Sequence, residues 1–409
     1  MTRHYDLADV RRQFPALLRQ QHGHPVAYFD GPGGTQVPET VADAMRDYLF
    51  FHNANTHWVY PTSVETDTLI VAARDAYADW FGCLPNEVVF GNNMTTLTMH
   101  ISRALGRQWS AGDEIVVTEL DHHANVDPWR EIAADRGLIV RRVAFHPETG
   151  EHDWEAFASV ITPKTKLVAV GAASNALGTI TDVARAAKLA RAVGALLYVD
   201  AVHFAPHRRI DVTAMDADFV VCSSYKFCGP HVGILYGRQA LLDSLNPPKL
   251  VPAPNQSPDR FETGTGNHEG IAGALAAVEF HASLGGAEGT RRERLDRAFA
   301  AIVAHEAPLL RRLWEGLGAL PRIRRFGPTP DRPRTGTMSF AVDGMSSEDV
   351  CRRLIPYGLF CSNGDFYAAT VVERLGYADA GLVRIGCAPY TTGEEIERLL
   401  SAVREIVGH

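Results

Sequence analysis

Two stretches decide the fold: ALLYVDAVHFAPH at residues 195–207 and DFVVCSSYKFCGP at 218–230. Each begins with an apolar run of strand length, and each run ends at polar residues. Five further apolar runs share this character: EVVFG (87–91), EIVVT (114–118), LIVRRVAF (138–145), KLVAVGA (166–172) and GILYG (233–237). Several are apolar throughout, as strands of a sheet covered on both faces must be. Because amphipathic helices such as 95–105 and 183–193 lie between them, the pattern predicts a mostly parallel α/β sheet.

The remaining sequence predicts a second, smaller domain. The chain has 409 residues, 46% of them hydrophobic, which is enough for two cores. After about residue 280 the pattern changes to a long charged helix over 291–317, a strand in TGTMSFAV (335–342) and a closing helix over 394–407. We expect a small α+β domain there. The Pro-rich stretch 246–258 predicts an extended surface segment.

Charge and composition exclude several classes of function. The net charge of -8 is spread along the chain, so no basic stripe is present to bind nucleic acid. No apolar stretch reaches 18 residues and the N-terminus is charged, so we expect no membrane span and a cytoplasmic protein. The six cysteines form no CxxC pair, which argues against a disulfide framework or a zinc ribbon.

Residues that follow the strands are the candidate site, because ligands of open α/β sheets bind beyond the carboxyl ends of the strands. GNNMTT leads into a helix, so the amides of Met94 and Thr95 and the Thr95 hydroxyl would face a phosphate, although an ordinary N-cap has the same pattern. TELDHHANVDPW supplies two histidines, one of which could stack on a flat cofactor. No third ligand stands at metal spacing, so we expect no metal site. Asn175 in SNALGT can donate a hydrogen bond.

The two defining stretches supply the chemistry. Asp200 ends a buried strand, where a carboxylate is costly unless it meets a cation such as a protonated pyridine nitrogen. Ser223, Tyr225 and Lys226 end the next strand, where desolvation lowers the pKa of a lysine and makes it an amine nucleophile. Each feature alone is weak, since most strand-end lysines are solvated. Their order along successive strands is specific.

With these motifs, the chain resembles a class V aminotransferase-fold enzyme, and within that fold a cysteine desulfurase-like protein. The resemblance runs from YFDGPGGTQVP (28–38) to VRIGCAPYTTGEEIERL (383–399). It implies pyridoxal 5'-phosphate as cofactor, fold type I and a homodimer. It also implies a large domain at 25–280 with a seven-stranded sheet, and a small α+β domain built from 1–24 and 281–409.

The resemblance further implies a role for each matching residue. Lys226 would hold the cofactor as a Schiff base, Asp200 would pair with its pyridine nitrogen, and His122 would stack on its ring, with His123 as the alternative. Three residues would hold the phosphate: Thr95, Ser223 and Tyr225. Asn175 and His203 would contact the ring and its 3-oxygen. Thr265 of FETGTGN would contact the partner subunit's phosphate, and Arg384 of LVRIG would bind the substrate carboxylate.

The pocket for the substrate side chain is expected from GPGGT (31–35), NANTHW (53–58) and SNGDFY (362–367). Asp365 and Tyr367 therefore join Asn175 and Arg384 as candidate substrate-binding residues.

One loop departs from the family. Desulfurases present a cysteine in a loop reading Arg-Thr-Gly-His-His-Cys, and that cysteine takes sulfur as a persulfide. Here the equivalent stretch is CSNGDFYAA (361–369), with Tyr367 in place of the cysteine, Ser362 in place of the arginine, and Cys361 six residues early. His203 replaces the family's glutamine and Tyr225 its histidine, and both changes resemble kynureninase-like members of the fold.

The leading prediction is therefore a lyase that acts on an amino acid by β-elimination or C–S cleavage, through a Lys226 Schiff base and a quinonoid, without an enzyme persulfide. The alternatives are a Cα epimerase, a kynureninase-like enzyme that makes or breaks bonds at Cβ or Cγ, and a non-catalytic sulfur-transfer accessory protein. Retention of Lys226, Asp200 and Arg384 argues against the accessory protein. A dehydrogenase would need GxGxxG, which GPGGTQVP does not supply.

Overall fold

The centre of the protein is a seven-stranded sheet. The computed structural model describes residues 5–408. The strand order is β4-β12-β11-β10-β9-β5-β6. The strands are β4 (Val88–Gly91), β5 (Glu114–Thr118), β6 (Ile139–Val143), β9 (Thr165–Gly171), β10 (Leu196–Asp200), β11 (Phe219–Ser223) and β12 (Gly233–Gly237). All seven apolar runs form these strands, so the predicted α/β class is confirmed. Only β12 among them runs antiparallel to its neighbours β11 and β4.

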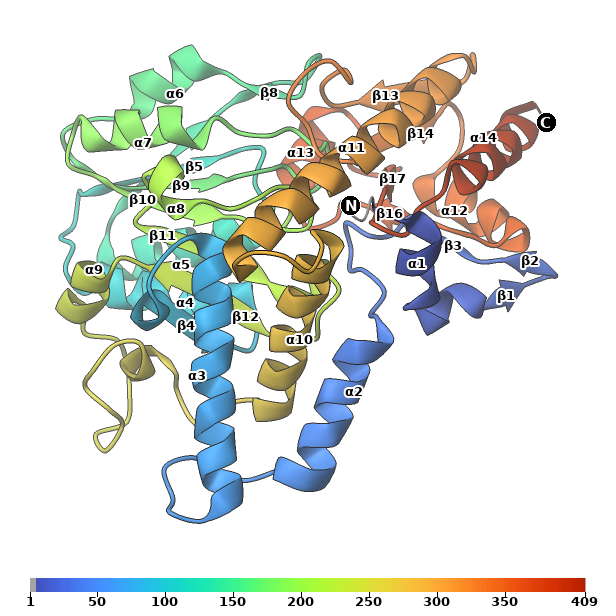
Figure 1. The fold of residues 1–409 in the computed structure, drawn as a ribbon. Coiled ribbons are helices and arrows are strands. Elements are labelled where there is room, and N and C mark those ends of the chain that lie inside the picture. The colour runs from blue at the N-terminus through green and yellow to red at the C-terminus, as the bar shows by residue number, and fades with distance from the viewer. Residues whose placement is uncertain (1–4, 409) are drawn as a thin grey trace.

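Helices cover both faces of this sheet, which explains why its strands are apolar throughout (Figure 1). Along β9, Val168 and Val170 pack into one core while Leu167 and Ala169 pack into the other. The first core is covered by α3 (Pro61–Phe81), α7 (Val183–Arg191) and α10 (His268–Leu284), and the second by α4 (Met94–Gly106) and α5 (Asp127–Arg136). The edge strand β6 is mostly exposed.

The C-terminal third forms a second, antiparallel sheet in the order β13-β14-β17-β16. Its strands are β13 (Ile323–Phe326), β14 (Thr337–Val342), β16 (Ser362–Gly364) and β17 (Leu382–Gly386), packed with α12 (Ser347–Leu354) and α14 (Gly393–Gly408). The long helix α11 (Arg291–Gly318) joins the two sheets, because Phe299 and Ile302 pack in the core of the large sheet while Leu313 and Leu317 pack in that of the small sheet.

The N-terminal segment lies against this second sheet. Phe14, which follows α1 (Leu7–Arg12), packs on Tyr390. Strand β3 (Ala27–Tyr28) pairs in parallel with β15 (Leu359–Phe360), and Asp30 bridges to Gly386. The N-terminal segment thus packs with the C-terminal third of the chain. The predicted boundaries at 24/25 and 280/281 stay a prediction.

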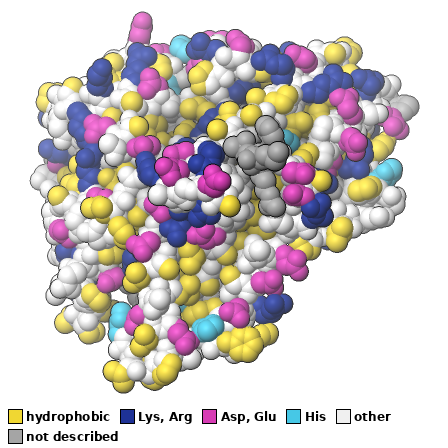
Figure 2. All heavy atoms as spheres, viewed as in Figure 1, with side chains coloured by type: hydrophobic (Ala, Val, Ile, Leu, Met, Phe, Trp, Pro, Cys, Tyr) yellow, Lys and Arg dark blue, Asp and Glu magenta, His cyan; other side chains and the backbone are white. Residues whose placement is uncertain are grey.

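Helices α2 (Glu39–Asp47) and α3, with the π-helix η2 (Tyr48–His52) between them, project from the body as an arm (Figure 1). Its end carries many exposed hydrophobic side chains, which gather at the lower end of the molecule in Figure 2. We define the arm surface as Leu49, Phe50, Phe51, Trp58, Val59, Tyr60 and Val64. Val59 is 99% exposed and Phe50 71% exposed. So large an apolar surface is typical of an interface.

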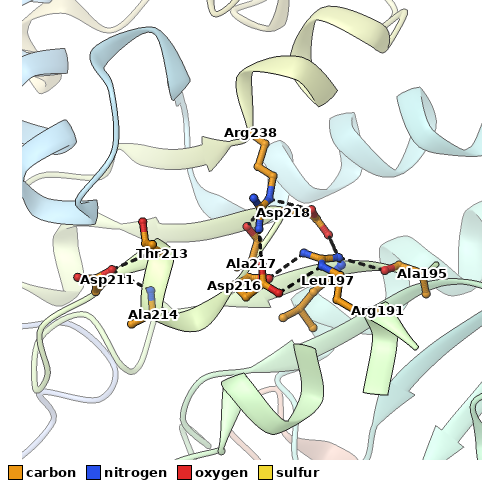
Figure 3. Close-up of polar contacts among 10 residues, drawn as sticks. All are labelled: Arg191, Ala195, Leu197, Asp211, Thr213, Ala214, Asp216, Ala217, Asp218 and Arg238. Atoms are coloured by element: carbon orange, nitrogen blue, oxygen red, sulfur yellow. Dashed lines mark hydrogen bonds and ion pairs between the residues drawn. The ribbon is translucent and has the colours of Figure 1, made fainter. Parts of the chain in front are cut away.

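A network of charged side chains lies at the edge of the large sheet where β10 and β11 begin (Figure 3). The carboxylate of Asp218 is buried, accepts a hydrogen bond from Leu197 N at 2.7 Å, and pairs with Arg191 at 2.7 Å and Arg238 at 3.0 Å. Asp211 caps α8 (Val212–Met215) beside it. The network thus joins α7 and the residue after β12 to Asp218, which directly precedes β11.

The remaining elements are short. They are η1 (Pro15–Leu18), β1 (Gln20–Gln21), β2 (His24–Pro25), η3 (Pro85–Glu87), η4 (His123–Asn125), β7 (Phe145–His146), β8 (Glu151–His152), α6 (Trp154–Val160), η5 (Ser224–Lys226), α9 (Gln239–Ser244), η6 (Asp259–Phe261), η7 (Ile355–Tyr357) and α13 (Ala369–Arg374). Within residues 5–408, no helix combines the length and the apolar character needed to cross a membrane.

Candidate active site

A cavity lies beyond the carboxyl ends of β4, β5, β9, β10 and β11. This is the place where an open α/β sheet binds ligands. It is lined by Met94, Thr95, Asp121, His122, Ala124, Gly171, Ala173, Asn175, Asp200, Val202, His203, Tyr225 and Lys226. Eight of the residues predicted from the sequence are therefore in one cavity.

Lys226 sits in the turn η5 directly after β11 and points to the N-terminal segment. Its Nζ donates hydrogen bonds to Pro32 O at 2.6 Å and Gly33 O at 3.0 Å. Burial, reinforced by the charge of Arg384, lowers the pKa of Lys226 to about 7. A large fraction of this amine is neutral near pH 7, as a nucleophile requires.

Asp200 is the last residue of β10 and is 7% exposed. Its Oδ1 accepts a hydrogen bond from Val202 N at 2.8 Å. Burial raises the pKa of Asp200 to about 6, and the charge of Lys226 opposes this shift. A cation in the cavity would stabilise the ionised carboxylate.

A second carboxylate, Asp121, also lines the cavity and was not predicted. It accepts hydrogen bonds from Gly171 N at 2.7 Å and Asn125 Nδ2 at 2.9 Å. Burial raises the pKa of Asp121 to about 7. A Cβ atom at Gly171 would come within 2.8 Å of Asp121 Oδ1, so this close approach needs glycine. The signal that identified Asp200, a carboxylate after a buried strand, also marks Asp121.

The two adjacent histidines have different surroundings. His122 lines the cavity, and its Nδ1 accepts a hydrogen bond from Ala124 N at 2.9 Å. Burial lowers the pKa of His122 to about 4, so its ring is neutral. His123 does not line the cavity; its Nδ1 lies 3.0 Å from Asp127 Oδ2 and its Nε2 lies 3.3 Å from Thr370 Oγ1.

The predicted phosphate contacts lie at the start of α4. The Met94 amide donates to Ser223 Oγ at 2.9 Å, so Ser223 supports the first turn of the helix and is not itself part of the cavity lining. Asn93 caps the helix by accepting from Thr96 N at 2.9 Å. Thr95 lines the cavity. The helix N-terminus favours an anion there.

Arg384 on β17 is 5% exposed and does not line the cavity. Its guanidinium carbon lies 4.3 Å from the centre of the Phe366 ring, and its NH1 donates to Asn175 O at 3.2 Å. Asn175 Nδ2 in turn donates to Phe366 O at 2.9 Å. Burial lowers the pKa of Arg384 to about 10, so the group stays cationic. Phe366 thus covers the predicted carboxylate-binding residue.

The loop that carries Phe366 also covers His122. The Tyr367 ring stacks on that of His122, with centroids 5.5 Å apart, and Tyr367 O accepts from His123 N at 2.7 Å. Phe366 and Tyr367 have φ of 58° and 55°, an uncommon left-handed conformation for aromatic residues. Asp365 is exposed and accepts from Tyr367 N at 2.9 Å. Neither Asp365 nor Tyr367 lines the cavity.

Three other predicted features lie outside the cavity. Thr265 is exposed, in the segment between η6 and α10. Residues 53–58 lie between η2 and α3 on the arm. The segment 31–35 contacts Lys226 through the carbonyls of Pro32 and Gly33.

All six cysteines are free and lie among the described residues, and none lines the cavity. Cys361 lies between β15 and β16, where burial raises the pKa of its thiol well above the usual value. Cys228 is buried. Among residues 5–408, no cluster of three or more His, Cys, Asp or Glu residues could hold a metal ion.

Two cavity residues have buried polar atoms without a hydrogen-bond partner among the described residues: Asn175 Oδ1 and His203 Nδ1. Such atoms are rare in folded proteins unless a ligand or water satisfies them. The cavity therefore combines an amine of low pKa, a buried carboxylate, a neutral imidazole and free hydrogen-bonding atoms. This set fits a polar, flat ligand that carries both a cationic and an anionic group.

Comparisons with known proteins agree with one another. The family model described as aminotransferase class-V matches residues 27–399. A probable cysteine desulfurase of Vibrio cholerae is 30% identical over 98% of both chains. A cysteine desulfurase of Synechococcus elongatus is 32% identical over 98% of this chain, which spans 64% of that protein. The apo structure of the cysteine desulfurase from Thermococcus onnurineus is 30% identical and superimposes with a TM-score of 0.88 over 98% of both chains.

Proposed function

Because the chain belongs to the aminotransferase class-V family, we propose that it is a pyridoxal-phosphate enzyme, a cysteine desulfurase-like lyase that carries no sulfur on its own cysteines. The observation that carries this proposal is the joint placement of Lys226 and Asp200 in one cavity, at the ends of neighbouring strands. Alone, each of these residues would place an unpaired charge in the protein interior, which costs free energy. Together they match an aldehyde and a ring nitrogen of one cofactor.

The residues of the cavity fit pyridoxal 5'-phosphate. Thr95 and the start of α4 would hold the phosphate, His122 would lie flat against the ring, and Asp200 would face the ring nitrogen. When bound, the cofactor supplies an electron sink for negative charge that develops at the substrate Cα.

The protein's own groups then have defined tasks. Lys226 is neutral enough near pH 7 to attack a carbonyl and afterwards to accept or return a proton at its Nζ. Asp200 is ionised above about pH 6, and a cation beside it would extend that range downward. Arg384 offers a planar bidentate partner for the substrate carboxylate, provided that Phe366 moves from its face.

The absence of a cysteine from the cavity lining supports release of sulfur without a persulfide. The thiolate is the form that attacks sulfur, and burial disfavours the thiolate of Cys361. Tyr367, at the loop position where desulfurases have cysteine, has no sulfur-transfer chemistry. With cysteine as substrate, the products would be free sulfide, ammonia and pyruvate, the last by hydrolysis of aminoacrylate.

A homodimer is part of this proposal. The arm surface is too apolar and too exposed for a free surface, and a second copy of the chain would bury it. Thr265 is exposed and away from its own cavity, as a residue that serves a partner's phosphate would be. The predicted cytoplasmic location stays a prediction.

The decisive experiment compares turnover of the wild type with Cys361→Ser, after amino acids are screened for spectral changes in the holoenzyme. We expect full activity in Cys361→Ser, and no added sulfur on any cysteine by mass spectrometry during turnover. A turnover-dependent sulfur adduct on Cys361, with activity lost in the serine variant, would return the protein to persulfide chemistry.

A second candidate is kynureninase-like cleavage or formation of a bond at Cβ or Cγ. It is favoured by His203 and Tyr225, which both line the cavity and both depart from the desulfurase pattern. Identification of the products distinguishes the two: sulfide or a thiol supports the lyase, whereas a carbon–carbon cleavage product supports the second candidate. Racemised substrate without either product would instead indicate a Cα epimerase.

A further inference from the structure

The loop segment Phe366–Tyr367 contacts three of the predicted site residues, although neither of its own two residues lines the cavity. The Tyr367 ring stacks on that of His122, with centroids 5.5 Å apart and planes inclined by 27°. Phe366 O accepts a hydrogen bond from Asn175 Nδ2 at 2.9 Å, and the Phe366 ring lies 4.3 Å from the guanidinium carbon of Arg384. Two consecutive residues therefore contact side chains that come from three different parts of the chain.

The backbone of this segment has an unfavourable conformation. Phe366 and Tyr367 have φ of 58° and 55°, and left-handed angles cost free energy at residues that carry a Cβ atom. Two local hydrogen bonds support the turn: Tyr367 N donates to Asp365 Oδ1 at 2.9 Å, and Ala368 N donates to Asp365 O at 2.8 Å. Such a conformation persists only where surrounding contacts stabilise it, and it occurs most often at functional sites.

His123, the second histidine of the pair, joins this segment to the large sheet's helices. Its backbone N donates to Tyr367 O at 2.7 Å. Its ring lies between α5 and α13, the helix that directly follows the loop, with Nδ1 3.0 Å from Asp127 Oδ2 and Nε2 3.3 Å from Thr370 Oγ1. Rotation of the Phe366 side chain away from the substrate-binding arginine would leave these contacts in place.

A backbone amide fixes the protonation of the His122 ring. Ala124 N can only donate, and it donates to His122 Nδ1 at 2.9 Å, so Nδ1 carries no hydrogen. A charged imidazolium would have a hydrogen on both ring nitrogens. The ring of His122 is therefore neutral, with its hydrogen on Nε2.

The exposure of Tyr367 shows what its strained backbone achieves. The residue is 74% exposed, so burial of its own ring does not explain the conformation. The conformation instead places the ring on His122 and two backbone carbonyls on Asn175 and His123. A stacked ring covers one side of the imidazole and restricts its rotation, and such a pair contributes free energy beyond the burial of its area.

We propose that Tyr367 is a positioning residue whose ring holds the neutral imidazole of His122 in the orientation in which it lines the cavity. The inference rests on the proposed function, in which His122 lies flat against the cofactor ring. Tyr367 does not itself line the cavity, so it acts through His122. At the loop position where desulfurases have the cysteine that takes sulfur, this chain thus has an aromatic residue that supports the cofactor site.

The first test needs neither cofactor nor a variant of Tyr367. Nuclear magnetic resonance of the full chain labelled with 15N-histidine reports the hydrogen on each ring nitrogen, with His122→Gln used for assignment. At pH 7 we expect a neutral His122 ring protonated at Nε2, and nuclear Overhauser contacts between the rings of His122 and Tyr367. Any other protonation of His122, or the absence of contacts between the two rings, would overturn the proposal.

The second test removes the ring with Tyr367→Ala and keeps it with Tyr367→Phe. The matched control is Tyr357→Ala, which removes a tyrosine on η7 that packs against the core of the small sheet. Reaction of histidines with diethyl pyrocarbonate, localised by tandem mass spectrometry, reports how far solvent reaches each neutral imidazole, with exposed His146 as the internal reference. We expect Tyr367→Ala to raise the labelling of His122 several-fold, and Tyr367→Phe and Tyr357→Ala to leave it unchanged.

Binding of pyridoxal 5'-phosphate should change in the same order. We expect Tyr367→Ala to weaken it roughly threefold to tenfold, the scale of one aromatic contact, and Tyr367→Phe to bind as the wild type does. Equal losses in Tyr367→Phe and Tyr367→Ala would assign the effect to the hydroxyl and overturn the proposal. Unchanged labelling of His122 in Tyr367→Ala, or the same rise in Tyr357→Ala, would also overturn it.

The outcomes separate this inference from the proposed function. If the wild type fails to bind pyridoxal 5'-phosphate, the proposed function fails, whereas the spectra and the labelling of His122 still decide whether Tyr367 holds that ring. If Tyr367→Ala does not fold, the ring-to-ring contacts of the wild type and the behaviour of Tyr367→Phe decide it.

Discussion

The low pKa of Lys226 can be tested in the protein without cofactor. Its fall from 10.5 to about 7 corresponds to about 5 kcal/mol of differential interaction between the charged and neutral amine. At pH 7.5 about three-quarters of the Lys226 side chains would be neutral, against about one in a thousand for an ordinary lysine. Lys226 should therefore be acetylated much faster than other lysines at that pH.

Competitive acetylation with acetic anhydride, read out by mass spectrometry of peptides, measures this directly. Lys164 is exposed and serves as the internal reference. We expect the labelling of Lys226 to reach half its maximum near pH 7. Arg384→Gln removes a charge that lowers the pKa and should move this midpoint upward, whereas Asp200→Asn removes one that raises it and should move the midpoint downward.

The sign of the stability effect provides a check. Between pH 7 and 10.5 an unfolded chain keeps a proton on Lys226 that the folded chain has lost, so the unfolded state binds more protons. Through this group the free energy of unfolding rises with pH across that window. A labelling midpoint above pH 9, or shifts of both variants in one direction, would refute the account of Lys226.

Three further predictions concern other parts of the molecule. Asp200→Asn should reduce turnover several-hundred-fold, or about 3–4 kcal/mol, and affect cofactor affinity much less; a collapse of affinity, by equilibrium dialysis, with normal turnover of the remaining holoenzyme would make Asp200 an anchor only. Asp218→Ala should lower the free energy of unfolding, measured in urea, by about 3 kcal/mol, because it leaves Arg191 and Arg238 without their buried partner. A loss under about 1 kcal/mol would show that solvent screens these two ion pairs. Phe51→Ser with Trp58→Ser should convert the dimer to monomer in sedimentation velocity, whereas a monomeric, fully active wild type would contradict the dimer.

The strands of the large sheet could be predicted because burial on both faces makes them apolar throughout. The direction of β12 could not, since GILYG is equally apolar in either direction. The positions of Asp200 and Lys226 followed from strand ends. Asp121 carries the same signal, but the prediction for that segment rested on the two histidines that follow it.

The contacts made by the loop 361–369 could not be predicted from the sequence. Phe366 contacts Arg384 because Phe366 and Tyr367 have left-handed backbone angles. Aromatic residues rarely adopt such angles, so the residue types at these positions do not predict the turn. The contact of segment 31–35 with Lys226 could not be predicted either, because it is made by backbone carbonyls, which every residue possesses.

The pairing of β3 with β15 constrains how the chain is made on the ribosome. Ala27 and Tyr28 emerge early in synthesis, but their strand partner is Leu359–Phe360, close to the end. All seven strands of the large sheet, from Val88 to Gly237, are complete long before that. Strand β3 must therefore wait, with its backbone groups bonded to water, until translation is nearly finished. A chain that stops short of residue 359 would leave this strand unpaired and open to association with other nascent chains.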